Sequence, residues 1–255
     1  FIQLSFKGTP FNGWQKQLNA PSVQEALEKG FSTLLHTPIE IIGAGRTDTG
    51  VHASYYIAHF DSPALIENIS DLIYHLNKIL PYEIAVQNIV PVISEAHARF
   101  DALSRTYCYQ ITQAKDPFGK DFSYYIGFPL DLKLLNKASS QLLTYDDFTS
   151  FCKLHSDNKT NICHIYKANW QKVENDYIFT IKADRFLRNM VRAIVGTILD
   201  IGKGKLSVEK FTRIIELKDR SAASTSAPSH GLYLVDIEYP EKLFQKKRLI
   251  RNEPE

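Results

Sequence analysis

The side chains best suited to chemistry in this sequence are gathered in residues 43–53, which read GAGRTDTGVHA. Three glycines, the carboxylate of Asp48, the guanidinium of Arg46 and the imidazole of His52 fall within these eleven residues. A glycine-rich connection lets the backbone bend sharply, and loops commonly carry functional side chains on a rigid scaffold. We therefore expect this stretch to be a loop whose polar side chains reach outward.

Both flanks of the loop, residues 39–42 and 55–60, are predicted to be strands. The plainest interpretation is then a turn, in which glycines supply positive φ and Asp48 accepts backbone N–H groups. A phosphate-binding loop is disfavoured because the Gly-Lys-Ser/Thr ending is absent and no helix follows. A metal site of Asp48 and His52 is weaker still, since two ligands are too few.

The composition is that of an ordinary globular protein. The chain has 255 residues, 44% of them hydrophobic and 23% charged, enough for one large domain or two small ones. It holds no apolar run long enough to cross a membrane and no signal-peptide pattern, and because it begins with Phe1 we expect a few residues to precede it. Three cysteines without paired spacing predict reduced thiols in a cytoplasmic protein.

Two of those cysteines invite a metal interpretation. Cys152, His155, Cys163 and His164 could be imagined as zinc ligands. However, Cys163 and His164 are adjacent, and neighbouring residues of an extended chain point to opposite faces. We therefore predict no metal site here.

The charge is nearly balanced, with 30 basic and 28 acidic residues and a net charge of +2, so it does not by itself indicate a nucleic-acid partner. The distribution is uneven. Basic residues are concentrated late in the chain, at Lys182, Arg185, Arg188, Arg192, Lys203, Lys205, Lys210, Arg213, Lys218, Arg220, Lys246, Lys247, Arg248 and Arg251. This cluster is consistent with a basic nucleic-acid-binding face or with ordinary solvated helix faces.

Hydrophobic periodicity divides the chain into two halves of similar pattern. The first half predicts a strand over 2–6 and a long loop over 7–20 that exposes Trp14. A helix opened by the capping pair Ser22 and Glu25 follows, and then the two strands around the glycine-rich loop. The half ends with a helix capped by Ser70 that stops before Pro81, and a strand from Ile84. The second half predicts strands over 106–111, 164–171, 176–183 and 232–239, and helices over 131–143 and 185–201 and from Ser207.

This order predicts an α+β fold of two split βαβ modules, ferredoxin-like or RRM-like, joined through a mostly antiparallel sheet. The expected domains are 1–104, which carries the Asp48 loop, and 105–255, which completes the site. No flexible linker is visible near residue 104.

The string GRTDTGVHA at 45–53 resembles the signature of the tRNA pseudouridine synthase A family. Further stretches resemble the other motifs of that family over nearly the whole chain: KGTPFNGWQKQ at 7–17, HARFDA at 97–102, RTYCY at 105–109, FLRNMVR at 186–192 and APSHGL at 227–232. The chain departs from the family pattern mainly over 145–165, where Asp146-Asp147-Phe148 and Cys163 stand in place of a His-Asp-Phe start and an arginine.

The resemblance implies a pseudouridine synthase fold and an isomerase of tRNA that converts uridine to pseudouridine at positions 38, 39 or 40 without a cofactor or a metal. It implies a homodimer that flips the target base out of its stack, and it makes Asp48 the catalytic residue. Whether such a carboxylate acts as nucleophile or general base stays open.

The resemblance also implies roles for residues that otherwise have plain interpretations. Tyr107, otherwise a core tyrosine, would stack on the uracil. Arg192, otherwise a surface arginine one helical turn from Arg188, would pair with Asp48. Arg46 would displace the base or hold a phosphate. The expected tRNA-binding residues are Tyr107, Arg46, Arg188, Lys203 and Lys205.

Two other classes remain as alternatives. A non-catalytic RNA-binding protein with tandem RRM-like modules is disfavoured because no aromatic RNP1 string is present. A nucleotide-binding enzyme is disfavoured by the missing lysine and helix after the glycine-rich loop.

Overall fold

The computed structural model describes residues 1–62, 64–154, 156 and 159–244. The chain divides into two compact units. The first unit comprises residues 1–103 and, within the described part, 234–244, and the second comprises residues 104–233. Residues 234–244 thus group with the first unit, whereas the expected second domain ran from 105 to 255. Within the described ranges, no helix combines the length and the apolar composition that crossing a membrane requires.

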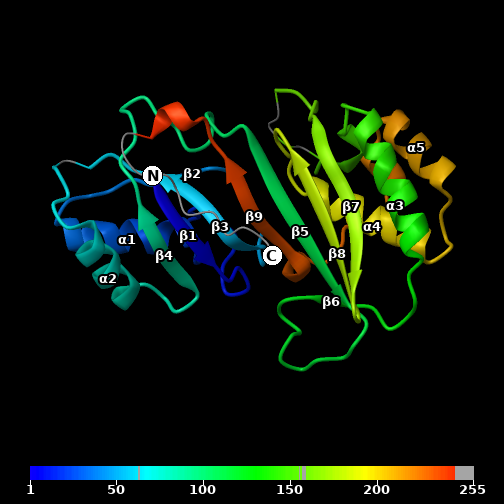
Figure 1. Cartoon of the computed structure of the whole chain (residues 1–255), viewed down its shortest axis with the longest axis horizontal. Coiled ribbons are helices and arrows are strands. Elements are labelled where there is room, and N and C mark those ends of the chain that lie inside the picture. The colour runs from blue at the N-terminus through cyan, green and yellow to red at the C-terminus, as the bar shows by residue number, and fades with distance from the viewer. Residues whose placement is uncertain (63, 155, 157–158, 245–255) are drawn as a thin grey trace. The chain divides into compact units, whose positions relative to one another are not determined.

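The first unit follows the β-α-β-β-α-β order (Figure 1). Its elements are β1 (Ile2–Phe6), α1 (Val23–Leu35), β2 (Ile42–Gly43), β3 (His52–His59), α2 (Ile69–Ile79) and β4 (Ile84–Ile89), with most of β9 (Leu232–Glu238). The sheet order is β4-β1-β3-β9, with β2 paired to β3. Strand β1 is antiparallel to both β3 and β4, which places Leu4 opposite Tyr56 on one side and Val86 on the other.

Two helices pack beside one another in this unit, and α2 also packs against β4 (Figure 1). Helix α1 buries Val23, Leu27 and Phe31, which lie four residues apart on one face. Ser22 caps the helix, as predicted, by accepting from the Glu25 amide at 3.2 Å. The cap predicted for α2 is wrong. The Oδ1 of Asn68, not Ser70, accepts from the Asp71 amide, so that helix begins at Ile69.

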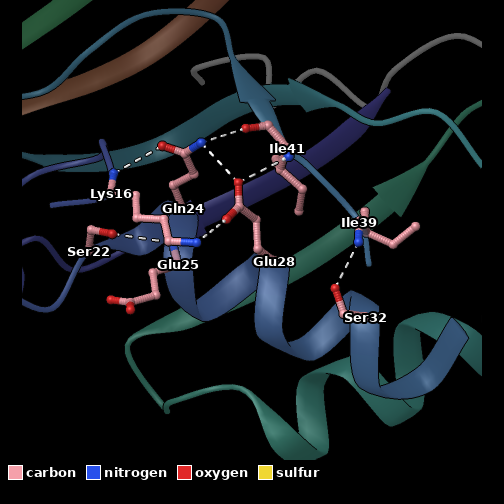
Figure 2. A network of polar contacts seen from close by, with 8 residues as sticks. All are labelled: Lys16, Ser22, Gln24, Glu25, Glu28, Ser32, Ile39 and Ile41. Atoms are coloured by element: carbon pink, nitrogen blue, oxygen red, sulfur yellow. Dashed lines mark hydrogen bonds and ion pairs between the residues drawn. The ribbon is translucent and has the colours of Figure 1, made fainter. Parts of the chain in front are cut away.

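The strand predicted before the glycine-rich loop is reduced to β2, because its first residues bond to side chains of α1 instead of to a strand (Figure 2). Ser32 Oγ accepts from the Ile39 amide at 2.9 Å, and Glu28 Oε1 accepts from the Ile41 amide at 3.3 Å. Gln24 Nε2 donates to the Ile41 carbonyl at 2.9 Å. Helix α1 therefore fixes the chain just before it enters the loop.

The second unit contains β5 (Ser104–Thr112), β6 (Tyr124–Tyr125), α3 (Leu132–Gln141), β7 (Ile165–Val173), β8 (Asp176–Ala183), α4 (Met190–Gly202) and α5 (Val208–Leu217). The strand order is β5-β8-β7 with antiparallel neighbours, and the short β6 runs parallel to β5. Helix α3 packs against β7 and α4, and α5 packs against α3 and α4 (Figure 1). The α+β class and the mostly antiparallel pairing are as predicted.

Helix α4 begins five residues later than predicted, at Met190 instead of Arg185. Asp184 Oδ1 accepts from the amides of His164 and Arg185, at 2.8 and 2.7 Å, which holds the chain in a bend after β8. Asn189 then adopts a left-handed φ of 64° and is the N-cap of α4. The motif at 186–192 is therefore a turn followed by the start of a helix.

Candidate active site

Asp48 lies in the loop between β2 and β3, and the backbone of this loop is fixed at both ends. The Ala44 amide donates to the Ile57 carbonyl at 2.8 Å, and the Val51 amide donates to the Asp48 carbonyl at 3.1 Å. Gly50 has a positive φ of 78° inside that turn. Asp48 is partly exposed and Arg46 is exposed, so both side chains can reach a ligand from a constrained backbone.

Two aromatic rings pack against residues 43–45, where the chain enters the Asp48 loop. Trp14 stacks on Tyr56 with ring centroids 4.2 Å apart, and the Tyr56 hydroxyl donates a short hydrogen bond to the Gly45 carbonyl. A Cβ at Gly43 would lie within 2.6 Å of the Tyr56 hydroxyl oxygen and of atoms of the Trp14 ring. Trp14 is 3% exposed, so the prediction that the 7–20 loop exposes it is wrong, because the ring fills the space that Gly43 leaves open.

Thr47, the residue before Asp48, has a structural feature that the sequence analysis did not predict. Its hydroxyl oxygen is buried and, within the described residues, has no hydrogen-bond partner. Leaving a buried hydroxyl unpaired costs about 1–3 kcal/mol. No feature of the sequence marks it, because the pairing of a hydroxyl depends on which atoms the folded chain brings near.

In the second unit, Tyr107 lies on the same face of the sheet as Tyr109, because a single residue, Cys108, separates them on β5. They lie opposite Ile181 and Phe179 of β8. Tyr107 is partly exposed, and its ring meets the edge of Phe186 with centroids 5.1 Å apart. Tyr109 is fully buried and donates to the Pro228 carbonyl at 2.7 Å. Tyr107 is thus the tyrosine of this pair that remains accessible.

Arg192 lies in the first turn of α4, and its Nε donates to the Ala227 carbonyl at 2.8 Å. The Ala227 amide in turn donates to the Arg192 carbonyl at 2.9 Å. Burial raises the pKa of the Tyr109 hydroxyl, and the positive charge of Arg192 opposes part of that rise. Arg192 is partly buried, so it is not the surface arginine of the plainest interpretation.

Arg188 does not share a helix face with Arg192 as predicted, because it lies in the turn before α4. Its side chain is exposed, and its carbonyl accepts from the Lys153 amide at 3.0 Å. A phosphate contact from Arg188 is compatible with this exposure.

The two lysines expected to bind tRNA lie at the other end of α4. Lys203 is the C-cap, eleven residues after Arg192, so about 16 Å of helix separates them. Lys203 Nζ lies 3.9 Å from Asp200 and 5.2 Å from the centre of the Phe128 ring, while Lys205 is exposed. The structure therefore does not bring Lys203 and Lys205 together with Arg192.

The candidate residues are divided between the units: Asp48 and Arg46 belong to the first, and Tyr107, Arg188, Arg192, Lys203 and Lys205 to the second. The pairing of Asp48 with Arg192 thus joins residues of different units and stays a prediction.

Part of the basic cluster is used inside the fold. Arg220 donates to the carbonyls of Ala223 and Ser224 and to the Ser226 hydroxyl, and Lys218 Nζ lies 2.9 Å from Asp147 Oδ2. These two residues therefore stabilise the second unit, whichever face binds RNA. The last members of the cluster, Lys246, Lys247, Arg248 and Arg251, lie outside the described residues.

The divergent segment 145–165 has structural partners of its own. Phe148 and Cys163 are buried, and Asp147 accepts from the Thr149 amide and hydroxyl at 3.1 and 2.6 Å. Burial raises the pKa of the Cys163 thiol to about 12. Among the described residues, no group of three or more His, Cys, Asp or Glu side chains could hold a metal ion, and His155 lies outside them.

Comparison with known proteins agrees with the signature around Asp48. A family model described as tRNA pseudouridine synthase matches residues 138–240. The chain is 53% identical over 244 residues to a tRNA pseudouridine synthase A of Parabacteroides distasonis, covering 96% of this chain and 97% of the relative. It is 52% identical over 250 residues to that of Bacteroides thetaiotaomicron, covering 97% and 93%. It is 37% identical over 240 residues to that of Bacillus subtilis, covering 92% and 97%. The chain therefore belongs to the tRNA pseudouridine synthase A family of isomerases.

Proposed function

We propose that this protein isomerises uridine to pseudouridine in tRNA and that Asp48 is its catalytic carboxylate. The observation that carries the proposal is the setting of Asp48, a partly exposed acid in the family signature on a loop with a fixed backbone. A fixed backbone matters because a reacting group must be held within a fraction of an ångström of its working geometry.

The reaction breaks the bond between C1′ of the ribose and N1 of uracil, turns the base, and joins C1′ to C5. A proton leaves C5 and N1 gains one, so the change is an isomerisation without net oxidation or reduction. One ionised carboxylate can serve it as a nucleophile at the sugar or as a general base. The target uridine must leave its stack, because a stacked nucleotide does not expose its sugar and base edge to a side chain.

The other site residues have proposed supporting roles. The accessible Tyr107 offers a ring on which uracil can stack. Arg192 is held through its Nε, which aims the guanidinium, and a guanidinium near a carboxylate keeps it ionised. Exposed Arg46, two residues from Asp48, is placed to hold a phosphate or to occupy the space that the flipped base leaves.

The finer parts of the proposal rest on the family. We propose uridines at positions 38, 39 and 40 of the anticodon stem-loop as targets, a homodimer as the working form, and the cytoplasm as its place. The relatives carry the name tRNA pseudouridine synthase A, which supports tRNA as the substrate class.

The test uses an unmodified tRNA transcript with uridines at those positions. We expect the wild-type protein to form pseudouridine, measured by mass spectrometry of nucleosides, and Asp48→Asn to form none. The variant should bind tRNA within a few-fold of wild type, because phosphate contacts supply most of the affinity.

Two results would contradict the proposal in different ways. Pseudouridine formation by Asp48→Asn would remove Asp48 from the chemistry. Binding of tRNA without any product from the wild-type protein would favour the non-catalytic RNA-binding alternative.

A further inference from the structure

A second loop, residues 8–14, lies directly against the loop that carries Asp48. The Gly8 amide donates to His52 Nδ1 at 3.1 Å, and the Trp14 amide approaches the Thr47 carbonyl at 3.4 Å. These contacts fall on both sides of Asp48, one just before it in sequence and one a few residues after it. The 8–14 loop thus touches the Asp48 loop at two points.

The closeness of the two loops depends on glycine. A Cβ at Gly8 would lie 2.0 Å from the Val51 carbonyl oxygen, and a Cβ at Gly13 would lie 2.3 Å from the Thr47 carbonyl oxygen and 3.3 Å from the Asp48 carbonyl carbon. Gly13 also has a φ of 90°, which other residues rarely adopt. The obstructing atoms are backbone, so any side chain at these positions must displace the Asp48 loop.

The 8–14 loop is itself held by α1. The Val23 amide donates to the Gly13 carbonyl at 3.4 Å, and the Gln24 amide donates to the Trp14 carbonyl at 3.0 Å. Gln24 Oε1 also accepts from the Lys16 amide at 3.0 Å (Figure 2). The contacts therefore run from a regular helix through the 8–14 loop to both sides of Asp48.

His52 is the side chain that closes this arrangement. It is 2% exposed, and Nδ1 accepts from Gly8, which places the proton of a neutral ring on Nε2. It is the first residue of β3, so its backbone is fixed by the sheet. A buried imidazole in a strand is a rigid acceptor for the 8–14 loop, which lies against the Asp48 loop.

We propose that His52 is a positioning residue for Asp48, acting through the Gly8 amide and the 8–14 loop. The inference rests on the proposed catalytic role of Asp48. A residue that only supported the fold would change the melting temperature and leave the rate of the folded enzyme intact. A positioning residue changes kcat in protein that remains folded, with little effect on KM for tRNA.

The first experiment compares the steady-state kinetics of two substitutions of His52 at a temperature well below the melting temperature of each variant. His52→Leu removes the acceptor at similar volume, and we expect kcat to fall about 100-fold, the loss expected from a misplacement of about 1 Å, with KM within about 3-fold of wild type. His52→Asn retains an acceptor near the position of Nδ1, and it should recover at least 10-fold of that loss, a rescue that volume alone does not produce.

The second experiment tests the close contact of Gly13 with the backbone of Thr47 and Asp48. Gly13→Ala should lower kcat about as much as His52→Leu. The matched control is Leu27→Ala, which opens a cavity at a fully buried residue of α1, outside residues 8–14 and 43–53. The control should lose melting temperature but keep the wild-type kcat.

The outcomes distinguish a failure of the positioning role of His52 from a failure of the proposed catalytic function. If wild type is active and Asp48→Asn is not, the function stands. A near-normal kcat in His52→Leu or Gly13→Ala, or equal losses in His52→Leu and His52→Asn, then overturns the positioning role. An inactive wild-type enzyme contradicts the proposed function instead. Equal kcat losses in Leu27→Ala would show that stability alone sets the rate.

Discussion

At the residue scale, a substitution of Thr47 can distinguish a destabilising buried hydroxyl from a hydroxyl that serves the substrate. Because its buried hydroxyl has no partner in the described chain, Thr47→Val should keep or raise the free energy of unfolding, by up to about 1 kcal/mol. Chemical denaturation measures this directly. A destabilised Thr47→Val would show that the hydroxyl is bonded in solution, and lost activity in a stable variant would show that it serves the substrate.

His59, the last residue of β3, gives the first unit a dependence on pH. Burial lowers the pKa of His59, the neighbouring charge of His97 lowers it further, and Asp61 opposes them. Its Nδ1 also accepts from the Ala98 amide at 3.1 Å, which favours the neutral ring. With the folded pKa below the unfolded one of about 6.5, the unfolded chain binds the proton more readily, so stability is lost as pH falls through that value.

We therefore expect the melting temperature to fall between about pH 7.5 and pH 5.5, and the fall to be smaller in His59→Asn, which keeps an acceptor but does not titrate. Thermal unfolding followed by circular dichroism over this range is the measurement. A variant with the same pH dependence as wild type would assign the effect to other groups.

The sequence was informative about single residues where the signal is local. The string at 45–53 made Asp48 a candidate through its resemblance to a family signature, because such a signature occupies consecutive residues. It did not reveal the burial of Trp14 or the unpaired hydroxyl of Thr47, since both depend on residues that approach only after folding. His52 looked like a weak metal ligand for the same reason, as its partner Gly8 is 44 residues away.

At the scale of elements, α1 acts as a support for two irregular segments. Gln24→Ala removes the acceptor of the Lys16 amide and the donor to the Ile41 carbonyl. We expect it to lower the free energy of unfolding by about 1–3 kcal/mol. Lys29→Ala is the matched control, because the Lys29 side chain is exposed in the middle of α1, and its melting temperature should stay near wild type. Equal effects of the two variants would show that helix propensity, not the network, is being measured.

Element types followed from periodicity, whereas their ends did not. The starts of α2 and α4 were misplaced because capping depends on which of several polar side chains reaches the free amides. Asn68 caps α2 in place of Ser70. Asp184 accepts from the Arg185 amide and holds the chain in a bend where the apolar pattern alone predicts the start of a helix. For α4 the difference matters, because it moves Arg188 off the helix and leaves Arg192 in the first turn.

At the scale of the whole molecule, tRNA binding should be electrostatic in spite of the small net charge. We expect affinity to fall steeply with salt and Lys205→Glu to reduce the slope of log affinity against log salt by about 1. Lys29→Glu, at an exposed position of α1, is the control of equal charge change. Filter binding at several salt concentrations measures both. An unchanged slope for Lys205→Glu would remove Lys205 from the binding face.

The grouping of β9 with the first unit has a consequence for how the protein is made. Strand β9 pairs with β3, the Leu103 amide donates to the Glu238 carbonyl at 2.8 Å, and the Ile93 amide donates to the Leu243 carbonyl at 3.0 Å. A ribosome releases these partners only after the whole second unit has been translated. The nascent first unit must therefore wait with one sheet edge unpaired, a state prone to association. Residues 104–233 are all translated before residues 234–238 of β9, so the unit whose synthesis begins first is the last to receive all its strands.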